Sequence, residues 1–130
     1  MTVYLDASAL AKLVAPEEET DALAAFLAQH PSQATSVIGL VEVRRAAARR
    51  PGVARARVED VLGRISAIGL DRTTVAAAGS TGPPALRTLD AIHLACAAAL
   101  GDDLEAFVTY DRHLADAARV LGMPDVAPGA

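Results

Sequence analysis

Four carboxylates in the 130-residue sequence stand where an acidic side chain needs an explanation: Asp6, Glu42, Asp90 and Asp111. Acids that flank or interrupt apolar segments are seldom buried unless they are paired or bind a metal. Carboxylates brought close together repel one another unless a cation neutralises them. Mg²⁺ and Mn²⁺ prefer oxygen ligands, and a bound ion can orient and deprotonate a water for in-line attack on phosphorus. If the four acids converge, the chemistry to expect is metal-assisted hydrolysis of a phosphate ester.

Two of these acids come just after segments that are typical of strands. Thr2–Leu5 is a short apolar run that ends at Asp6, and Asp111 follows a strand predicted over Ala106–Thr109. Ligands of open α/β sheets collect at the carboxyl ends of the strands, so both acids should lie at the same sheet edge. The simpler interpretation is that Asp6 and Asp111 each cap the helix that follows.

The other two acids lie on apolar helices. Asp90 stands at the start of one, and Glu42 interrupts the apolar pattern of another. Asp90 is also explained as a first-turn acid that the helix dipole favours, and Glu42 as a solvent-facing residue beside Arg45 or Ala46. From the residues alone these alternatives stay open, although two helices that bring acids to the sheet edge would complete a site for a divalent cation.

Short apolar strands alternating with helices must position these acids. We expect strands over Thr2–Leu5, Gln33–Thr35, Ile68–Leu70 and Ala106–Thr109, with one more edge strand within residues 125–130. We expect helices over Asp6–Val14, Glu17–Gln29, Val37–Arg50, Val53–Ile65, Thr73–Ala78, Leu89–Leu100 and Asp111–Leu121. This alternation favours an α/β sandwich with a mostly parallel short central sheet and helices on both faces. Residues 1–130 should form a single domain, within which Val37–Ile65 is an Arg-rich helical hairpin.

Composition narrows the function classes. The chain is 52% hydrophobic, which argues against disorder, and only 3% aromatic, which argues against a base-stacking platform. The net charge of −4 disfavours nucleic-acid binding by bulk charge, but seven of the 11 arginines lie between Arg44 and Arg64. The single cysteine, Cys96, lies in an apolar run and is expected in the core. No signal peptide or membrane span is expected, which predicts a cytoplasmic protein.

The segments around the four acids carry a family resemblance. They are YLDASALAK at Tyr4–Lys12, LVEVRRA at Leu40–Ala46, LDAIHLA at Leu89–Ala95 and VTYDRHL at Val108–Leu114. In content and order they resemble the four acidic motifs of the PIN-domain family, in its VapC-type ribonuclease toxins. The resemblance spans nearly the whole chain, and four motifs in order are far more specific than one.

This resemblance implies a PIN-like three-layer fold and a metal-dependent endoribonuclease that hydrolyses RNA phosphodiester bonds. Asp6 and Asp90 would be the main ligands of Mg²⁺, with Mn²⁺ as a substitute. Glu42 and Asp111 would complete the acidic site and help to position the attacking water.

Three further residues enter through the same resemblance. Ser8 and Thr109 match hydroxyl positions that hydrogen-bond the acids or water at the metal, and their alternative role is helix capping or turn support. His93 follows Asp90 by three positions on the same helix flank. We expect it to be structural or to support the acids, rather than to act as a general base.

The resemblance also implies partners, and it leaves alternatives. VapC-type toxins act on RNA, are inhibited by a VapB-like antitoxin, and form homodimers or toxin–antitoxin hetero-oligomers. The Arg-rich hairpin is the region expected to contact antitoxin or the RNA backbone. The alternatives are a catalytically idle PIN-like binding module, which would not need all four acids, and a PIN nuclease with an RNA-processing role. A phospho-accepting receiver domain is disfavoured because it needs a lysine from a late strand, and the only lysine is Lys12.

Overall fold

A computed structural model describes all residues, 1–130, and shows a five-stranded sheet in the order β3-β2-β1-β4-β5. Every strand pair is parallel, and β1 lies at the centre between β2 and β4. The strands are β1 (Thr2–Leu5), β2 (Gln33–Ser36), β3 (Ser66–Ile68), β4 (Leu104–Val108) and β5 (Asp125–Val126). The helices are α1 (Ala7–Val14), α2 (Thr20–Ala28), α3 (Val37–Ala48), α4 (Arg55–Leu62), α5 (Arg72–Gly79), α6 (Thr88–Ala98) and α7 (Arg112–Val120), with a 3₁₀ turn at Gly101–Asp103.

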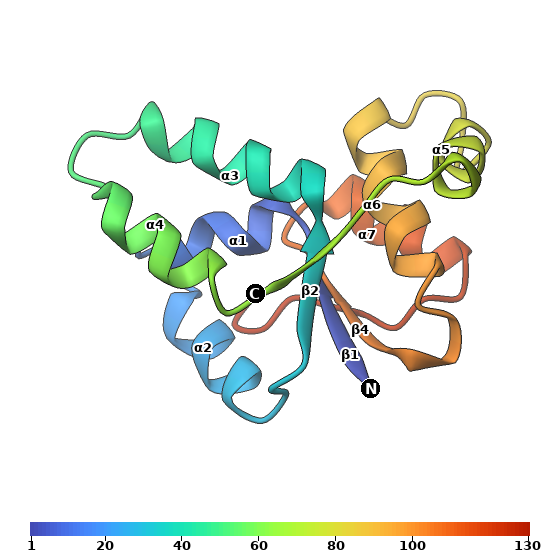
Figure 1. The fold of residues 1–130 in the computed structure, drawn as a ribbon. Coiled ribbons are helices and arrows are strands. Elements are labelled where there is room, and N and C mark those ends of the chain that lie inside the picture. The colour runs from blue at the N-terminus through green and yellow to red at the C-terminus, as the bar shows by residue number, and fades with distance from the viewer.

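Helices cover both faces of the sheet, as predicted. Figure 1 shows α1, α2, α3 and α4 on one side and α5, α6 and α7 on the other. Successive side chains of a strand point to opposite faces, so Val3 and Leu5 enter the core under α1–α4, whereas Tyr4 enters the core under α6 and α7. Tyr4 stacks there on Phe107, with ring centroids 5.5 Å apart. The α/β three-layer architecture inferred from the alternation is therefore confirmed.

Several elements differ from their predicted bounds by two residues or more. The fourth strand begins at Leu104 and not at Ala106, and the fourth helix covers Arg55–Leu62 and not Val53–Ile65. The second helix begins at Thr20 and not at Glu17, because the Glu17 carboxylate turns back to bind the Lys12 ammonium at 2.8 Å. The third strand covers Ser66–Ile68, two residues before the predicted position. This edge strand is fixed by backbone pairing with β2, and its first two residues are exposed, so it has no hydropathy pattern to reveal it.

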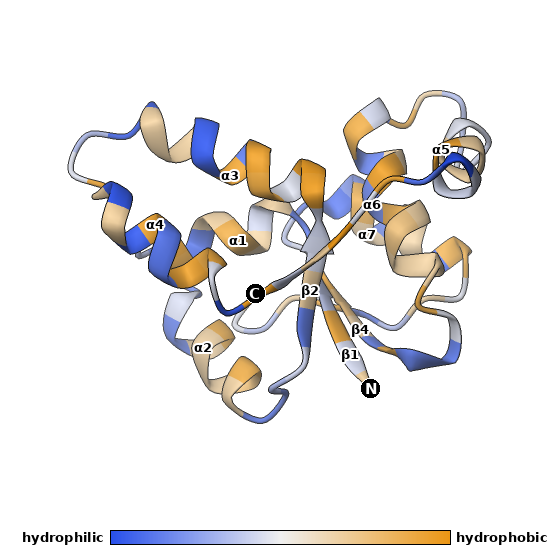
Figure 2. Ribbon diagram, viewed as in Figure 1, coloured by the Kyte–Doolittle hydropathy of each residue, from blue (hydrophilic) through white to orange (hydrophobic).

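The consecutive helices α3 and α4 project away from the sheet, and hydrophilic residues dominate their outer parts (Figure 2). Several of their arginines are already engaged: Arg44 binds Glu59, Arg64 binds Asp60, and Arg50 binds Glu17. Arg45 and Arg49 form no ion pair and are exposed. None of the helices in the structure is long and apolar enough to cross a membrane.

Candidate active site at the carboxyl edge of the sheet

The central strands β1 and β4 are parallel neighbours, so their carboxyl ends lie side by side. Leu5 of β1 is in register with Val108 of β4, so the residues that follow these strands meet at the carboxyl edge of the sheet. Asp6 begins α1 and Asp111 begins α7, each with its side chain as the N-cap. The capping interpretation and the sheet-edge interpretation are therefore both correct for these two acids, because a capping carboxylate keeps free lone pairs.

The Asp6 carboxylate is buried and held on both oxygens. Its Oδ1 accepts hydrogen bonds from Ser8 Oγ at 2.6 Å and from the Ala9 amide at 2.9 Å, and its Oδ2 accepts one from Thr109 Oγ1 at 2.6 Å. Only 3% of Asp6 is exposed. Burial raises the pKa of Asp6, and the hydrogen bonds from Ser8 and Thr109 offset part of that rise. Asp6 is thus fixed in one orientation.

Ser8 and Thr109 connect this carboxylate to the loop after β4. Ser8 Oγ accepts a hydrogen bond from the Tyr110 amide at 2.9 Å, and Thr109 Oγ1 accepts one from the Asp111 amide at 3.1 Å. Each hydroxyl therefore donates to Asp6 and accepts from the loop that carries Asp111. A hydroxyl can do both at once, which makes Ser and Thr suitable at these positions.

The carboxylates of Asp111 and Asp90 differ in the hydrogen bonds that they accept. Asp111 Oδ1 accepts hydrogen bonds from the amides of His113 at 2.9 Å and Leu114 at 3.2 Å. Asp90, in the first turn of α6, is half-buried and forms no hydrogen bond or ion pair. Burial raises the pKa of Asp90, and the nearby charge of Asp111 raises it further. The nearby charge of Arg87 offsets this rise in pKa only in part, and Asp90 has a carboxylate with no direct hydrogen-bond or ion-pair partner.

Glu42 lies on α3 and contacts α6 through His93. Its Oε1 lies 2.7 Å from Nε2 of His93, which is on α6 together with Asp90. His93 is 1% exposed, and its Nδ1 lies 2.7 Å from the Tyr4 hydroxyl. Glu42 does not simply face solvent beside Arg45 or Ala46. The buried environment of His93 agrees with the expected supporting role.

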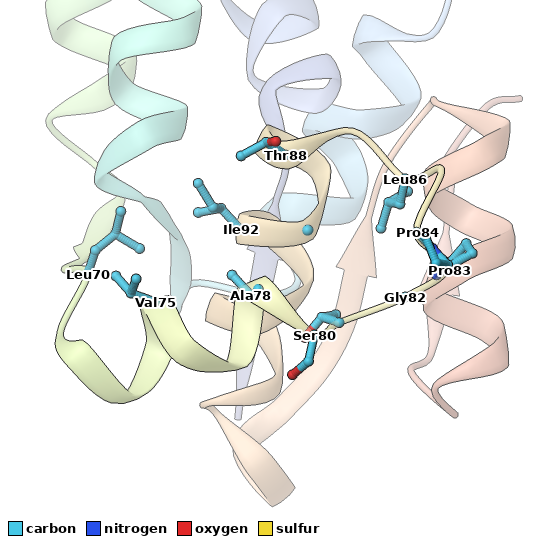
Figure 3. A pocket seen from close by; sticks show the side chains of 13 residues that line it. Leu70, Val75, Ala78, Ser80, Gly82, Pro83, Pro84, Leu86, Thr88 and Ile92 are labelled. Carbon is cyan, nitrogen blue, oxygen red and sulfur yellow. The ribbon is translucent and has the colours of Figure 1, made fainter.

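A cleft of about 780 Å³ opens beside Asp90 and Asp111. Its charged and titratable lining is made of Arg87, Asp90, Asp111, His113 and Asp116, and its apolar wall includes Leu86, Val120 and Leu121. Gly82, Pro83 and Leu86 line both this cleft and a second pocket of about 510 Å³, shown in Figure 3, whose other lining residues include Val75 of α5 and Ile92 of α6. That second pocket contains none of the four acids. The cleft beside Asp90 is therefore the candidate substrate site.

Sequence reasoning did not single out the cleft residues Arg87, His113 and Asp116, nor Tyr4 as the partner of His93. The spacing held a usable signal for Arg87, which stands three residues before Asp90, and for Asp116, which stands five after Asp111. The Tyr4–His93 contact had none, since the two residues are 89 positions apart.

The donor set suits a hard divalent ion that keeps part of its water. No three of the His, Cys, Asp or Glu side chains are grouped tightly enough to enclose a metal by themselves. Mg²⁺ does not need such a cage, because it binds proteins through one or two carboxylates and retains several waters. Both oxygens of Asp90 are free of hydrogen bonds, and only Oδ1 of Asp111 is engaged. Asp90 and Asp111 therefore fit a partly hydrated Mg²⁺ or Mn²⁺, whereas Asp6 is buried, does not line the cleft, and would bind such an ion only through lone pairs left by its hydrogen bonds.

Comparison with known proteins identifies the family to which this chain belongs. The PIN-domain family model matches residues 3–120. Two proteins of Mycobacterium tuberculosis, ribonuclease VapC46 and ribonuclease VapC47, are each 40% identical to this chain, over 126 and 134 residues respectively. These alignments cover 97% of both chains for the first and 98% of both for the second.

Solved structures agree on the fold. The VapBC2 complex of Rickettsia felis bound to promoter DNA has a chain with a TM-score of 0.74 at 14% identity, covering 98% of this chain and 99% of that one. VapC20 of M. tuberculosis, a toxin that cleaves the sarcin–ricin loop, has a TM-score of 0.73 at 16% identity, covering 97% and 99%. The family model and the two ribonuclease VapC relatives at 40% identity show that the chain is a member of the PIN-domain family, of the VapC type.

Proposed function

We propose that this chain is a metal-dependent endoribonuclease that cuts RNA phosphodiester bonds in the cytoplasm, and that a VapB-like antitoxin inhibits it. The observation that carries the proposal is the carboxylate of Asp90, which has no hydrogen-bond or ion-pair partner and lines the same cleft as Asp111. The ribonuclease names of relatives at 40% identity support the choice of RNA. The intact set of four acids argues against a catalytically idle module.

The side chains divide the work at the scissile phosphate. Asp6 and Asp90 would hold Mg²⁺ or Mn²⁺, which supplies positive charge for the phosphate and activates water. The hydrogen bonds from Ser8 and Thr109 keep Asp6 from rotating away, so its orientation is set before substrate arrives. Glu42, whose carboxylate is held by His93, would complete the acidic site and help to position the attacking water.

The cleft also suits an inhibitory peptide. Three carboxylates and an apolar wall of Leu86, Val120 and Leu121 would accept a segment that carries a basic side chain among apolar ones. Val120 is 87% exposed in the free chain, which leaves apolar surface for a partner to cover. We therefore propose the antitoxin as the occupant, in a toxin–antitoxin hetero-oligomer or around a homodimer of the toxin. Light scattering of the chain alone and of the co-expressed pair measures these states.

The test is cleavage of total RNA by the purified chain with Mg²⁺, with Mn²⁺ and with EDTA. Asp6→Asn and Asp90→Asn should each abolish cleavage while far-ultraviolet circular dichroism stays unchanged. The matched control is Asp102→Asn, the same change at an exposed acid in the 3₁₀ turn before β4, which should cut like the wild type. Cleavage that persists in EDTA, or that survives Asp90→Asn at the wild-type rate, would refute the metal assignment.

If folded wild-type chain cuts no RNA, calorimetric titration with Mn²⁺ provides the second measurement. Binding that is lost in Asp90→Asn keeps the metal site and directs the search to other RNA substrates. No binding at all supports the idle-module alternative.

A further inference from the structure

A buried chain of hydrogen bonds runs from the backbone of β2 to the carboxylate of Glu42. The Ser36 amide lies 3.1 Å from the Tyr4 hydroxyl oxygen, the same oxygen lies 2.7 Å from Nδ1 of His93, and Nε2 of His93 lies 2.7 Å from Oε1 of Glu42. Tyr4 is fully buried and His93 is 1% exposed. No water reaches the middle of this chain, so its members depend on one another for hydrogen bonds.

The donors and acceptors favour one direction along the chain. The Ser36 amide can only donate, so the Tyr4 oxygen accepts there and keeps its own proton free to donate to Nδ1 of His93. An imidazole that accepts at Nδ1 carries its proton on Nε2, and that proton is then directed at Glu42. Every polar atom of the chain is satisfied with a neutral ring and an ionised Glu42.

The position of His93 connects two acids of the site. Asp90 and His93 are one turn apart on α6, whereas Glu42 projects from α3 in another layer of the fold. The two helices approach closely at Gly39, where an added Cβ would lie 3.2 Å from Cε1 of His93. His93 is therefore the direct hydrogen-bond link between Glu42 and the helix that carries Asp90.

We propose that His93 is a positioning residue: its Nε2–H, held in that tautomer by Tyr4, fixes the Glu42 carboxylate at the acidic site. The competing interpretation is a core histidine that only fills space and stabilises the fold. For its effect on cleavage the inference rests on the proposed ribonuclease function, whereas the hydrogen-bond chain can be measured without any activity.

The first experiment is nitrogen-15 NMR of the histidine side chains in the full chain at neutral pH. His93 should appear as the neutral Nε2–H tautomer, with an Nε2 proton that exchanges slowly with water because the ring is buried. Tyr4→Phe removes the proton donated to Nδ1 and should convert this pattern to a mixture of tautomers. The exposed His113 is an internal reference. A wild-type His93 protonated on Nδ1, alone or on both nitrogens, overturns the proposed direction.

The second experiment separates positioning from stability through two substitutions at the same buried site. His93→Gln keeps an N–H donor near the Nε2 position, whereas His93→Met has similar length and donates nothing. Loss of a residue that orients a metal-site group typically lowers activity about 10–100-fold, so His93→Met should lose kcat by that factor with little change in KM. His93→Gln should recover at least part of it, although both variants melt below the wild type.

Equal kcat in the two variants, or a loss that follows the melting temperature alone, overturns the positioning role. Glu42→Gln supplies the background for a double-mutant cycle, in which His93→Met should cause no further loss because its target is already altered. Should the wild-type chain cleave no RNA with any metal, the proposed function fails, while the tautomer measurement still decides whether the hydrogen-bond chain exists.

Discussion

Gly39 lies where α3 passes closest to the site, and replacing it with alanine tests the packing of that region. An alanine Cβ there would collide with Oγ1 of Thr35, lie 3.2 Å from His93, and lie 3.4 Å from a methyl group of Leu10. Thr35 is fully buried in β2, and its hydroxyl has no hydrogen-bond partner. The neighbour that must move is therefore held by the sheet and cannot yield cheaply.

The magnitude follows from two opposing effects. Gly→Ala inside a helix gains about 1 kcal/mol from helix propensity, whereas overpacking a tight core costs about 1–3 kcal/mol. Because the added Cβ collides with Thr35, the cost should lie in the upper part of that range, about 2–3 kcal/mol. We therefore expect Gly39→Ala to lower the free energy of unfolding by about 1–2 kcal/mol, which for a domain of this size is a fall of about 3–8 °C in Tm. Thermal denaturation followed by circular dichroism measures it directly.

The control is the same substitution at Gly79, the last residue of α5, where no atom lies within 4 Å of the added Cβ. Gly79→Ala should leave Tm unchanged or raise it slightly. Thr35→Ala removes the colliding hydroxyl, so it should restore part of the stability lost in Gly39→Ala, with a coupling of about 1 kcal/mol. A Gly39→Ala variant as stable as the wild type, or more stable, would refute the steric reasoning.

Three other sets of substitutions have effects on Tm or on RNA cleavage whose direction can be predicted. Asp90→Asn should raise Tm at pH 7 without metal. Burial raises the pKa of Asp90, so its ionised form destabilises the folded state relative to the unfolded state. The gain in Tm should vanish near pH 3, where the carboxyl is protonated in both states. Lys12→Met should lower Tm at pH 7, and by less as the pH falls below about 4.5, because Lys12 lowers the pKa of Glu17 and protonation removes that stabilisation; a difference independent of pH would contradict this. Arg45 and Arg49 form no ion pair, so they are free to contact RNA. If each contacts one phosphate, replacing both with glutamine should make the slope of log kcat/KM against log salt concentration less steep by about 1.4. An unchanged slope would place the RNA elsewhere.

The alternation of strands and helices along the chain was predictable because the central strands β1 and β4 are short apolar runs and turn residues separate the helices. The same rule placed Asp6 and Asp111 at one edge, since the carboxyl ends of neighbouring parallel strands must coincide. The short edge strand at Ser66–Ile68 was misplaced because backbone pairing, and not side-chain hydrophobicity, determines where it begins.

Side-chain contacts between helices of different layers could not be predicted from the sequence. The pairing of Glu42 with His93 depends on how closely α3 approaches α6, and that distance is set by the missing side chain of Gly39. The surroundings of Lys12 were equally hidden: its ammonium binds Glu17 and Glu19, each at 2.8 Å, and only 8% of the residue is exposed. No periodic pattern encodes such contacts, because they arise from loop conformation and from the packing of separate helices.

The hydrogen bond between Thr109 and Asp6 has a consequence for how the chain is made. It joins residues 103 positions apart, and β1 has its neighbour β4 only after that late strand has been synthesised. A nascent chain whose last third is still on the ribosome has an Asp6 without its Thr109 partner and no Asp90 or Asp111 in place. If the chain is a ribonuclease, a nascent chain that has not yet been synthesised as far as Asp111 lacks a complete set of acids, so it cannot cut the messenger from which it is being translated.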